Sequence, residues 1–140
     1  MFHHILIGYD GSANAKKALE YAIDIAMHAR AEVTIATAFA RVPEAASEPI
    51  AQTLRAALTA EAQHLAEMAA EQARACGIEP VGVEVMEGPP AESLLRSAMN
   101  NRCDCIVVGA RGRGEMTGLL LGSVSDRLVQ YARVPVLIVK

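Results

Sequence analysis

A glycine-rich stretch with two arginines follows an apolar run late in the sequence. From Gly109 to Asp126 the chain reads GARGRGEMTGLLLGSVSD, with five glycines, directly after the run CIVV. Each glycine costs backbone entropy that an alanine would not, so the local excess needs a structural or a chemical reason. Bare backbone lets a ligand approach closely, and the start of a helix binds anions through free N–H groups. The stretch therefore predicts either a set of turns or a phosphate-binding loop.

The residue types within this stretch favour the phosphate-binding loop. We expect Gly109 and Gly112 to bring backbone close to a ligand. Gly122 would open a last helix, whose N–H groups and dipole favour an anion. Hydroxyl donors and positive charge would come from four further residues of the stretch, namely Ser123, Ser125, Arg111 and Arg113. Bare N–H groups, hydroxyls and a helix start together have the chemistry of a phosphate site.

A second candidate ligand-binding turn follows the first apolar run of the chain. Asp10, Gly11 and Ser12 come directly after HHILIGY. Taken alone, they could form only a turn and a helix cap, because Asp and Ser are favoured there for local reasons. In an open α/β sheet, ligands bind beyond the carboxyl ends of the strands where the winding direction reverses. If the first and fourth strands are neighbours, both turns line one crevice, and a ligand-binding role for Asp10 becomes the better hypothesis.

The segments that would position these turns alternate between strand and helix along the chain. Short apolar, β-branched runs predict strands over 3–9, 32–39, 81–88, 104–110 and 134–140. Apolar residues at steps of three and four predict helices from Ser12, from about Ile50 to Cys76, from Pro90, and over about 123–132. The apolar residues of the second predicted helix form a long seam from Leu54 to Cys76, which we interpret as buried core. The alternation predicts one α/β domain over residues 1–140, a five-stranded parallel sheet with helices on both faces.

Composition and charge exclude several classes of protein. The chain has 140 residues, of which 52% are apolar and 21% charged, and this composition disfavours disorder. The formal net charge of −3 disfavours a nucleic-acid or anionic-membrane binder, and with it an RNA contact by RGRG. No apolar run approaches the length of a membrane span, and the start MFHHILIGYDGS lacks the marks of a secretory signal. We expect a cytoplasmic protein that binds neither nucleic acid nor a membrane.

The three cysteines, Cys76, Cys103 and Cys105, are few and odd in number. In the absence of an export signal we expect free, buried thiols. Cys103 and Cys105 could form part of a zinc site together with His3 and His4. The Cys-x-Cys pair has no third ligand at hand, however, and structural zinc needs four. The sequence therefore favours free thiols over a metal site.

The spacing of the late glycines resembles that of a known family. A Walker loop needs a lysine directly before Ser123, and the Rossmann fingerprint needs Gly-x-Gly-x-x-Gly after the first strand; both are absent. Gly109-x-x-Gly112, nine residues, and then Gly122-Ser123 is similar to the nucleotide-binding signature of the universal stress protein family, in its ATP-binding branch. The resemblance covers the whole chain. The stretches that carry it are ILIGYDGS, EGPPAESLL, DCIVVGARGRG and LLLGSVSDRLVQYARVPVLIVK.

The resemblance implies a fold and a set of nucleotide-binding residues. The fold would be a doubly wound, Rossmann-like open sheet with strand order 3-2-1-4-5. Asp10 would lie at the ribose-phosphate end and help to hold Mg²⁺ or Mn²⁺, and Ala38 would face adenine through its backbone. Tyr9 is larger than the residues often found at its position. The complete set that the resemblance implies is Gly8, Tyr9, Asp10, Ala38, Val108, Gly109, Arg111, Gly112, Gly122, Ser123, Val124 and Ser125.

Three functions compete on this evidence. The first is a regulatory module of the stress response that binds ATP, or ADP or AMP, with a divalent cation. The second is an enzyme, either a slow ATP hydrolase or a nucleotidyl-transfer relative. His28 has no serine or cysteine placed with it, and the sequence shows no nucleophile–base pair. The third is a nucleotide-free dimeric scaffold. The glycine signature favours the first function.

The last predicted strand indicates a homodimer. It consists of the apolar residues PVLIV before the final lysine, and nothing follows in the sequence to cover its edge. An uncovered apolar edge strand invites pairing with a second chain, and two-fold dimers are the commonest closed assemblies. The family resemblance implies dimers through the same strand. We expect an interface that includes Val136 together with Ile138 or Val139.

Overall fold

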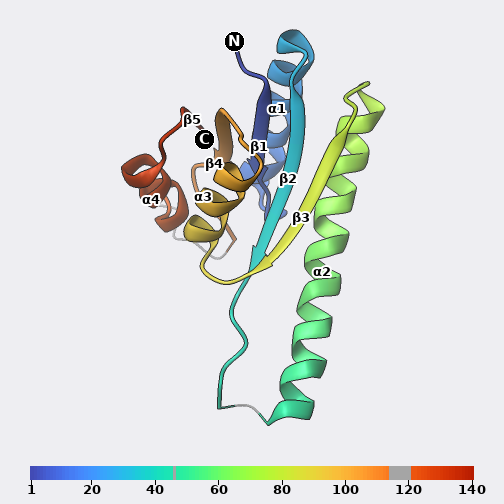
Figure 1. The fold of residues 1–140 in the computed structure, drawn as a ribbon, viewed down its shortest axis with the longest axis vertical. Helices are drawn as coiled ribbons and strands as arrows, with labels where there is room; N and C mark the ends of the chain where they lie inside the picture. Colours follow the sequence, from blue (N-terminus) through green and yellow to red (C-terminus); the bar gives the residue numbers. More distant parts are fainter. Residues whose placement is uncertain (46, 114–120) are drawn as a thin grey trace.

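Strands and helices alternate along the chain in the computed structural model, which describes residues 1–45, 47–113 and 121–140 (Figure 1). Gly114 and Gly118 of the glycine-rich stretch lie outside the described residues. None of the described helices is long and apolar enough to cross a membrane. The elements are β1 (His4–Gly8), α1 (Ala13–Ala29), β2 (Glu32–Phe39), α2 (Glu48–Ala75), β3 (Val81–Glu87), α3 (Pro90–Asn100), β4 (Cys105–Gly109), α4 (Ser123–Tyr131) and β5 (Val136–Val139).

The five strands form one parallel sheet in the order β3-β2-β1-β4-β5 (Figure 1). Ile5 of β1 pairs with Val33 of β2 on one side and with Cys105 of β4 on the other. The chain winds outward from β1 to β3 and then crosses back to β4. The reversal of the winding therefore falls between β1 and β4, as the family resemblance implies, and the carboxyl ends of these two strands flank the same crevice.

Helices cover both faces of the sheet and create two cores. Ile5 and Ile7 of β1 pack with α1 and α2, whereas Leu6 packs with α3 and α4. This division follows from the two-residue period of a strand, which sends successive side chains to opposite faces. All three residues are fully buried, as expected of a central parallel strand covered on both sides.

Local sequence signals set several of the helix ends. The Ser12 hydroxyl accepts the N–H of Ala15 at 3.1 Å and caps α1. Pro90 occupies the first position of α3, where its missing N–H would have had no helical partner. Gly77 follows α2 with φ of +89°, a left-handed conformation that suits glycine. The starts of α1 and α3 confirm the helix starts predicted at Ser12 and Pro90.

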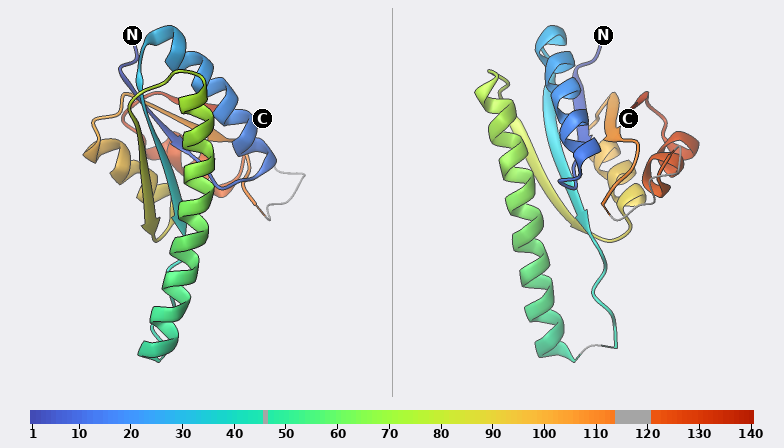
Figure 2. Two further views of the ribbon diagram at one scale, coloured as in Figure 1. Left: turned by 90° about the vertical axis from the view of Figure 1, so that its right-hand side faces the viewer. Right: turned by 180° about the vertical axis from the view of Figure 1, so that it is seen from behind.

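Helix α2 extends well beyond the carboxyl edge of the sheet (Figures 1 and 2). Its buried alanines lie mainly between Ala62 and Ala73, where the helix packs on the sheet. Leu54, in the extending part, is 38% exposed, and Cys76 at the other end is exposed. The interpretation of the whole seam from Leu54 to Cys76 as core is therefore wrong at both ends, because the helix is longer than the sheet that it covers.

The three thiols differ in their surroundings, and this difference predicts their reactivity. Cys76 is exposed, whereas Cys103 and Cys105 are buried, so the expectation of three buried thiols is wrong for Cys76. Burial raises the pKa of the Cys103 thiol to about 12 and that of Cys105 to about 11. Since the thiolate is the reactive form, a brief treatment with a thiol reagent at about pH 8 should label Cys76 alone. Mass spectrometry of the intact folded protein should show one adduct, and three after unfolding; rapid triple labelling of the folded protein would contradict the assigned burial.

Candidate functional site

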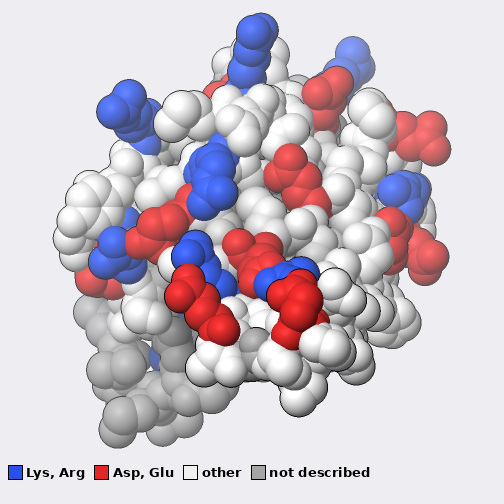
Figure 3. Space-filling view, turned by 60° about the horizontal axis from the view of Figure 1, so that its bottom comes forward, with Lys and Arg blue, Asp and Glu red and all other residues white. Residues whose placement is uncertain are grey.

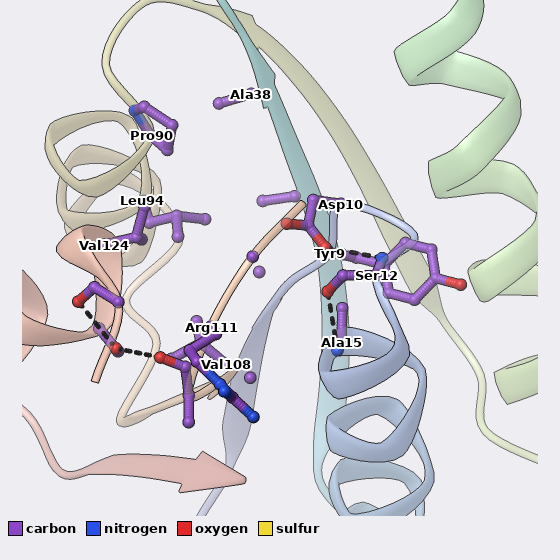
Figure 4. A pocket seen from close by; sticks show the side chains of 17 residues that line it. Tyr9, Asp10, Ser12, Ala15, Ala38, Pro90, Leu94, Val108, Arg111 and Val124 are labelled. Carbon is purple, nitrogen blue, oxygen red and sulfur yellow. Dashed lines mark hydrogen bonds between the residues drawn. The ribbon is translucent and has the colours of Figure 1, made fainter. Parts of the chain in front are cut away.

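A hollow lies at the carboxyl edge of the sheet, between the ends of β1 and β4 (Figure 4). Its empty space is about 560 Å³, counting the open mouth, which falls in the range of small-ligand sites. Four segments contribute: the β1–α1 turn, the end of β2, the start of α3 and the segment from β4 to α4. The lining residues are Gly8, Tyr9, Asp10, Ser12, Ala15, Ala36, Ala38, Pro90, Leu94, Val108, Gly109, Ala110, Arg111, Gly112, Gly122, Val124 and Ser125.

The hollow brings together every residue of the set implied by the sequence resemblance except Ser123. That serine is the first residue of α4, and its side chain is exposed. The structure also adds lining residues for which the sequence analysis predicts no ligand-binding role. Pro90 and Leu94 are the main additions, and they belong to the stretch EGPPAESLL, which carried part of the resemblance. In the sequence, these two residues are apolar positions at the start of a predicted helix, and such positions are equally typical of buried core.

The two sides of the hollow differ in chemistry. Ala38, Pro90 and Leu94 form an apolar wall, and Asp10 and Arg111 lie away from it (Figure 4). Leu94 is buried and fixed by the core between α3 and the sheet. The arrangement suits a ligand with a flat, weakly polar group at one end and a charged group at the other.

Three helices begin beside the hollow, and the N-cap residues of α3 and α4 make no side-chain capping hydrogen bond. The Ser12 side chain caps α1, and α3 begins at a proline without an N–H group. The N-cap of α4 is Gly122, which has no side chain with which to cap the helix. The first-turn N–H groups, from Ser123 onward, have no carbonyl partner within the helix. Of these three helix starts, α4 is therefore the best suited to bind an anion.

The Ser125 hydroxyl fixes the start of α4 to the end of β4. Its oxygen lies 2.7 Å from the carbonyl oxygen of Ala110 and 3.1 Å from that of Gly122, and the residue is 1% exposed. The N–H of Gly122 also donates to the Ala110 carbonyl, at 2.6 Å. A hydroxyl has one hydrogen to donate, and here it is directed at backbone. In this structure Ser125 thus shapes the turn before α4, whereas the sequence suggested that its hydroxyl donates directly to a ligand.

Two of the glycines in the hollow are explained by packing. A Cβ atom on Gly109 would lie 2.7 Å from Cβ and 2.8 Å from the carbonyl carbon of Asn14 in α1. A Cβ on Gly8 would lie 2.8 Å from a methyl group of Leu94. The Gly109 contact involves backbone, which cannot move aside as a flexible side chain can. Gly109 therefore allows β4 and α1 to approach each other, a reason distinct from the ligand approach that the sequence suggested.

Asp10 joins the two turns that border the hollow. One carboxylate oxygen accepts the N–H of Ser12 at 2.9 Å, and the other accepts the N–H of Arg113 at 3.2 Å. Among the described residues, no group of three His, Cys, Asp or Glu side chains could hold a metal ion. Asp10 alone fits Mg²⁺, since this cation keeps several waters and is often bound by one or two carboxylates plus substrate phosphates. The residues present thus fit a cation shared with a phosphorylated ligand.

The ring of Tyr9 points away from the hollow, toward α2 (Figure 4). Tyr9 belongs to the core between the sheet and the helices α1 and α2, and it is 8% exposed. Its N–H donates to the Ala36 carbonyl at 2.9 Å, and its carbonyl accepts the Thr37 hydroxyl at 2.7 Å. Burial, together with the charge of Asp10, raises the pKa of the Tyr9 hydroxyl. The size of this residue therefore does not narrow the hollow.

Acidic and basic side chains are intermixed on the face that carries the hollow, as far as the structure describes it (Figure 3). Several form pairs across elements; Arg55 of α2 donates to Glu87 of β3 at 2.8 Å, and Arg127 of α4 pairs with Glu92 of α3. The hydrogen bond from Arg55 lowers the pKa of the Glu87 carboxyl. Such mixed charge suits a small ligand better than an extended polyanion, which would need a broad basic surface.

Comparison with known proteins agrees with this geometry. The profile of the Universal stress protein family matches residues 1–140. The chain belongs to this family. A universal stress protein of Thermus aquaticus, described by its place in the QAH/OAS sulfhydrylase 3′ region, is 34% identical over 140 residues, which cover all of both chains.

Solved structures of universal stress proteins have the same fold. UspA from Lactobacillus plantarum superposes with a TM-score of 0.89 at 22% identity, over 99% of this universal stress protein and 97% of that chain. A universal stress protein in complex with cAMP superposes with a TM-score of 0.77 at 26% identity, over 99% and 97% of the two chains. The predicted sheet order and family are thereby confirmed.

Proposed function

We propose that this universal stress protein binds an adenine nucleotide in the hollow between β1 and β4. The observation that carries the proposal is a single hollow that combines the glycine-rich start of α4 with apolar surface from Ala38 and Pro90. Phosphates would lie at this helix start, where N–H groups and the helix dipole favour negative charge. The related protein solved with cAMP supports a ligand that combines adenine with phosphate.

The adenine would lie against the apolar wall. Ala38 at the end of β2 and Pro90 at the start of α3 provide small, rigid surfaces on which a flat ring can stack. Backbone groups at the end of β2 would supply the hydrogen bonds to the edge of the base. The ribose would then lie between this wall and the β1–α1 turn. In this orientation the phosphates of the nucleotide would lie on the same side of the hollow as Asp10 and Arg111.

The resident nucleotide is proposed to be ATP with Mg²⁺ or Mn²⁺. Asp10 would provide the protein ligand to the cation, and the phosphates would provide others. Bound to phosphate, the cation would supply charge neutralisation. Arg111, which lines the hollow, would add positive charge near the phosphates. Titration calorimetry with ATP, ADP and AMP, with and without Mg²⁺, tests the assignment: ATP should bind best with the cation, and equal affinities without any cation effect would contradict it.

We propose that the protein acts as a regulatory module in a cytoplasmic stress response rather than as a rapid enzyme. Among the described residues that line the hollow, Asp10 is the one carboxylate, and no histidine, glutamate or cysteine accompanies it. Phosphoryl transfer needs a positioned nucleophile as well as charge neutralisation. We therefore expect ATP turnover well below the roughly 1–10³ s⁻¹ typical of enzymes. A steady-state assay that gave several turnovers per second, lost in Asp10→Asn, would contradict this.

We also propose a homodimer that pairs through β5. This strand lies at the edge of the sheet, and its residues Val136, Leu137 and Ile138 are half-buried. Val139 is buried, so Val136 and Ile138 are the better interface candidates. Sedimentation equilibrium should show a dimer that Ile138→Arg converts to a folded monomer, because a buried, unpaired charge at an interface is costly. A parent protein that stays monomeric at high micromolar concentration would defeat the proposal.

A further inference from the structure

Three charged residues form a chain of contacts beside the candidate site. The backbone N–H of Arg113 donates to one carboxylate oxygen of Asp10, at 3.2 Å. The guanidinium of Arg113 reaches the other way, and its Nη1 lies 3.7 Å from Oε1 of Glu61 on α2. The glycine-rich segment, the β1–α1 turn and the long helix are thus connected through a single arginine.

The Arg113 side chain lies next to the candidate site without lining it. Asp10 and Ala38 border both the nucleotide hollow and a second hollow on the α2 side, whereas Arg113 and Glu61 border only the second. The backbone of Arg113 is one hydrogen bond from a group that faces the nucleotide. A long, flexible side chain at this position has two possible partners, Glu61 on one side and the nucleotide phosphates on the other.

These two partners imply two ways to neutralise a bound phosphate. A divalent cation at Asp10 is one, and the Arg113 guanidinium is the other. The two compete, because a guanidinium that reaches the phosphates places positive charge where the cation would lie. The Glu61 carboxylate contacts the guanidinium on the α2 side and balances its charge.

We propose that Glu61 determines how strongly nucleotide binding depends on a divalent cation. With Glu61 present, the Arg113 guanidinium is held mainly on the α2 side, and the phosphates rely chiefly on the cation at Asp10. Without Glu61, the guanidinium is released and substitutes in part for the cation. Glu61 and Arg113 therefore determine the preference of the site for the metal-bound over the metal-free nucleotide. This inference rests on the proposed nucleotide site and adds to it a role for α2.

The measurement is the Kd of ATP with Mg²⁺ and with EDTA, and the quantity of interest is the ratio of the two values. Glu61→Gln should lower the cation dependence about two- to fivefold, because ATP binds more tightly in EDTA and less tightly with Mg²⁺. Arg113→Gln should raise the dependence by a similar factor, since it weakens binding in EDTA. We expect changes of this modest size because exposed ion pairs have small interaction energies. The Glu61 side chain is 62% exposed and the Arg113 side chain is 61% exposed.

A second ion pair on α2 provides the matched control. Glu67 lies on the same helix, and its carboxylate is 3.6 Å from the Arg74 guanidinium. Neither residue borders the two hollows. Glu67→Gln removes the same charge from the same helix, and it should leave the cation dependence of ATP binding unchanged. A general effect of net charge or of helix stability would instead change the cation dependence of ATP binding equally in Glu61→Gln and Glu67→Gln.

The outcomes separate this inference from the function on which it rests. If the parent protein binds ATP but Glu61→Gln leaves the cation dependence unchanged, the inference is overturned and the nucleotide site stands. A shift of the same sign in Glu61→Gln and Arg113→Gln also overturns it, because loss of either partner would then act through structure alone. If the parent protein binds no adenine nucleotide under either condition, the proposed function fails, and the inference fails with it.

Discussion

Gly122→Val is expected to lower the affinity for ATP by at least about a hundredfold, or close to 3 kcal/mol. Gly122 is buried, lines the hollow and is the N-cap residue of α4. A branched side chain there would occupy the space assigned to the phosphates. The backbone at Gly122, with φ of −78° and ψ of 172°, is extended, and valine adopts this conformation readily. The cost should therefore fall on the ligand rather than on the turn.

A graded pair of variants checks this explanation. Gly122→Ala adds one carbon atom and should weaken ATP binding less than Gly122→Val does. Thermal unfolding of each variant, followed by circular dichroism, shows whether the fold is retained. A Gly122→Val protein that unfolds cooperatively and binds ATP like the parent would contradict the placement of the phosphates at this turn.

Ser123→Pro is expected to weaken ATP binding about tenfold to a hundredfold while the helix is retained. Proline is favoured at the first position of a helix, and the extended backbone of Gly122 is compatible with a following proline. The substitution removes the N–H group of residue 123, one of the donors proposed to bind phosphate. A hydrogen bond to a charged group contributes about 1.5–3 kcal/mol, which corresponds to the expected loss. Calorimetric titration measures it.

Ala13→Pro is the matched control at another helix on the same edge of the sheet. Ala13 is the first residue of α1, and Ser12 before it has an extended backbone, with ψ of 163°. Because the Ser12 side chain caps this helix, its first N–H is not assigned to the ligand. Ala13→Pro should bind ATP like the parent. Equal losses in the two proline variants would mean that proline disturbs this edge in general, and the assignment of phosphates to α4 would lose its support.

The fold could be predicted from the sequence because its determinants are local. Alternating strand and helix patterns specify an α/β sheet, and caps such as Ser12 and Pro90 act on their own helices. The extent of burial along α2 could not be predicted in the same way. Apolar spacing shows which side of a helix is apolar, but the length of sheet beneath it depends on the tertiary structure. Leu54 and Cys76 belong to the apolar seam and are nevertheless exposed.

The candidate site was predicted in outline, and its contacts were not. The spacing of Gly109, Gly112 and Gly122 marked the loop, and the structure gathers these residues around one hollow. The reason for Gly109 is a close approach to Asn14, a contact between distant parts of the chain. The Ser125 hydroxyl is directed at backbone carbonyls, which only the folded turn reveals. Sequence spacing thus indicated the position of the candidate site, whereas the contacts of its side chains required the packed structure.

The most direct test of the nucleotide site is an amide chemical-shift titration of the ¹⁵N-labelled protein with ATP and Mg²⁺. The proposed site predicts the largest shifts at Gly122, Ser123 and Val124, which start α4, and at Gly8 and Asp10 in the β1–α1 segment. Amides at the opposite edge of the sheet should change little. A spectrum that stays unchanged up to millimolar ATP, or shifts confined to residues away from the hollow, would contradict the binding of an adenine nucleotide between β1 and β4.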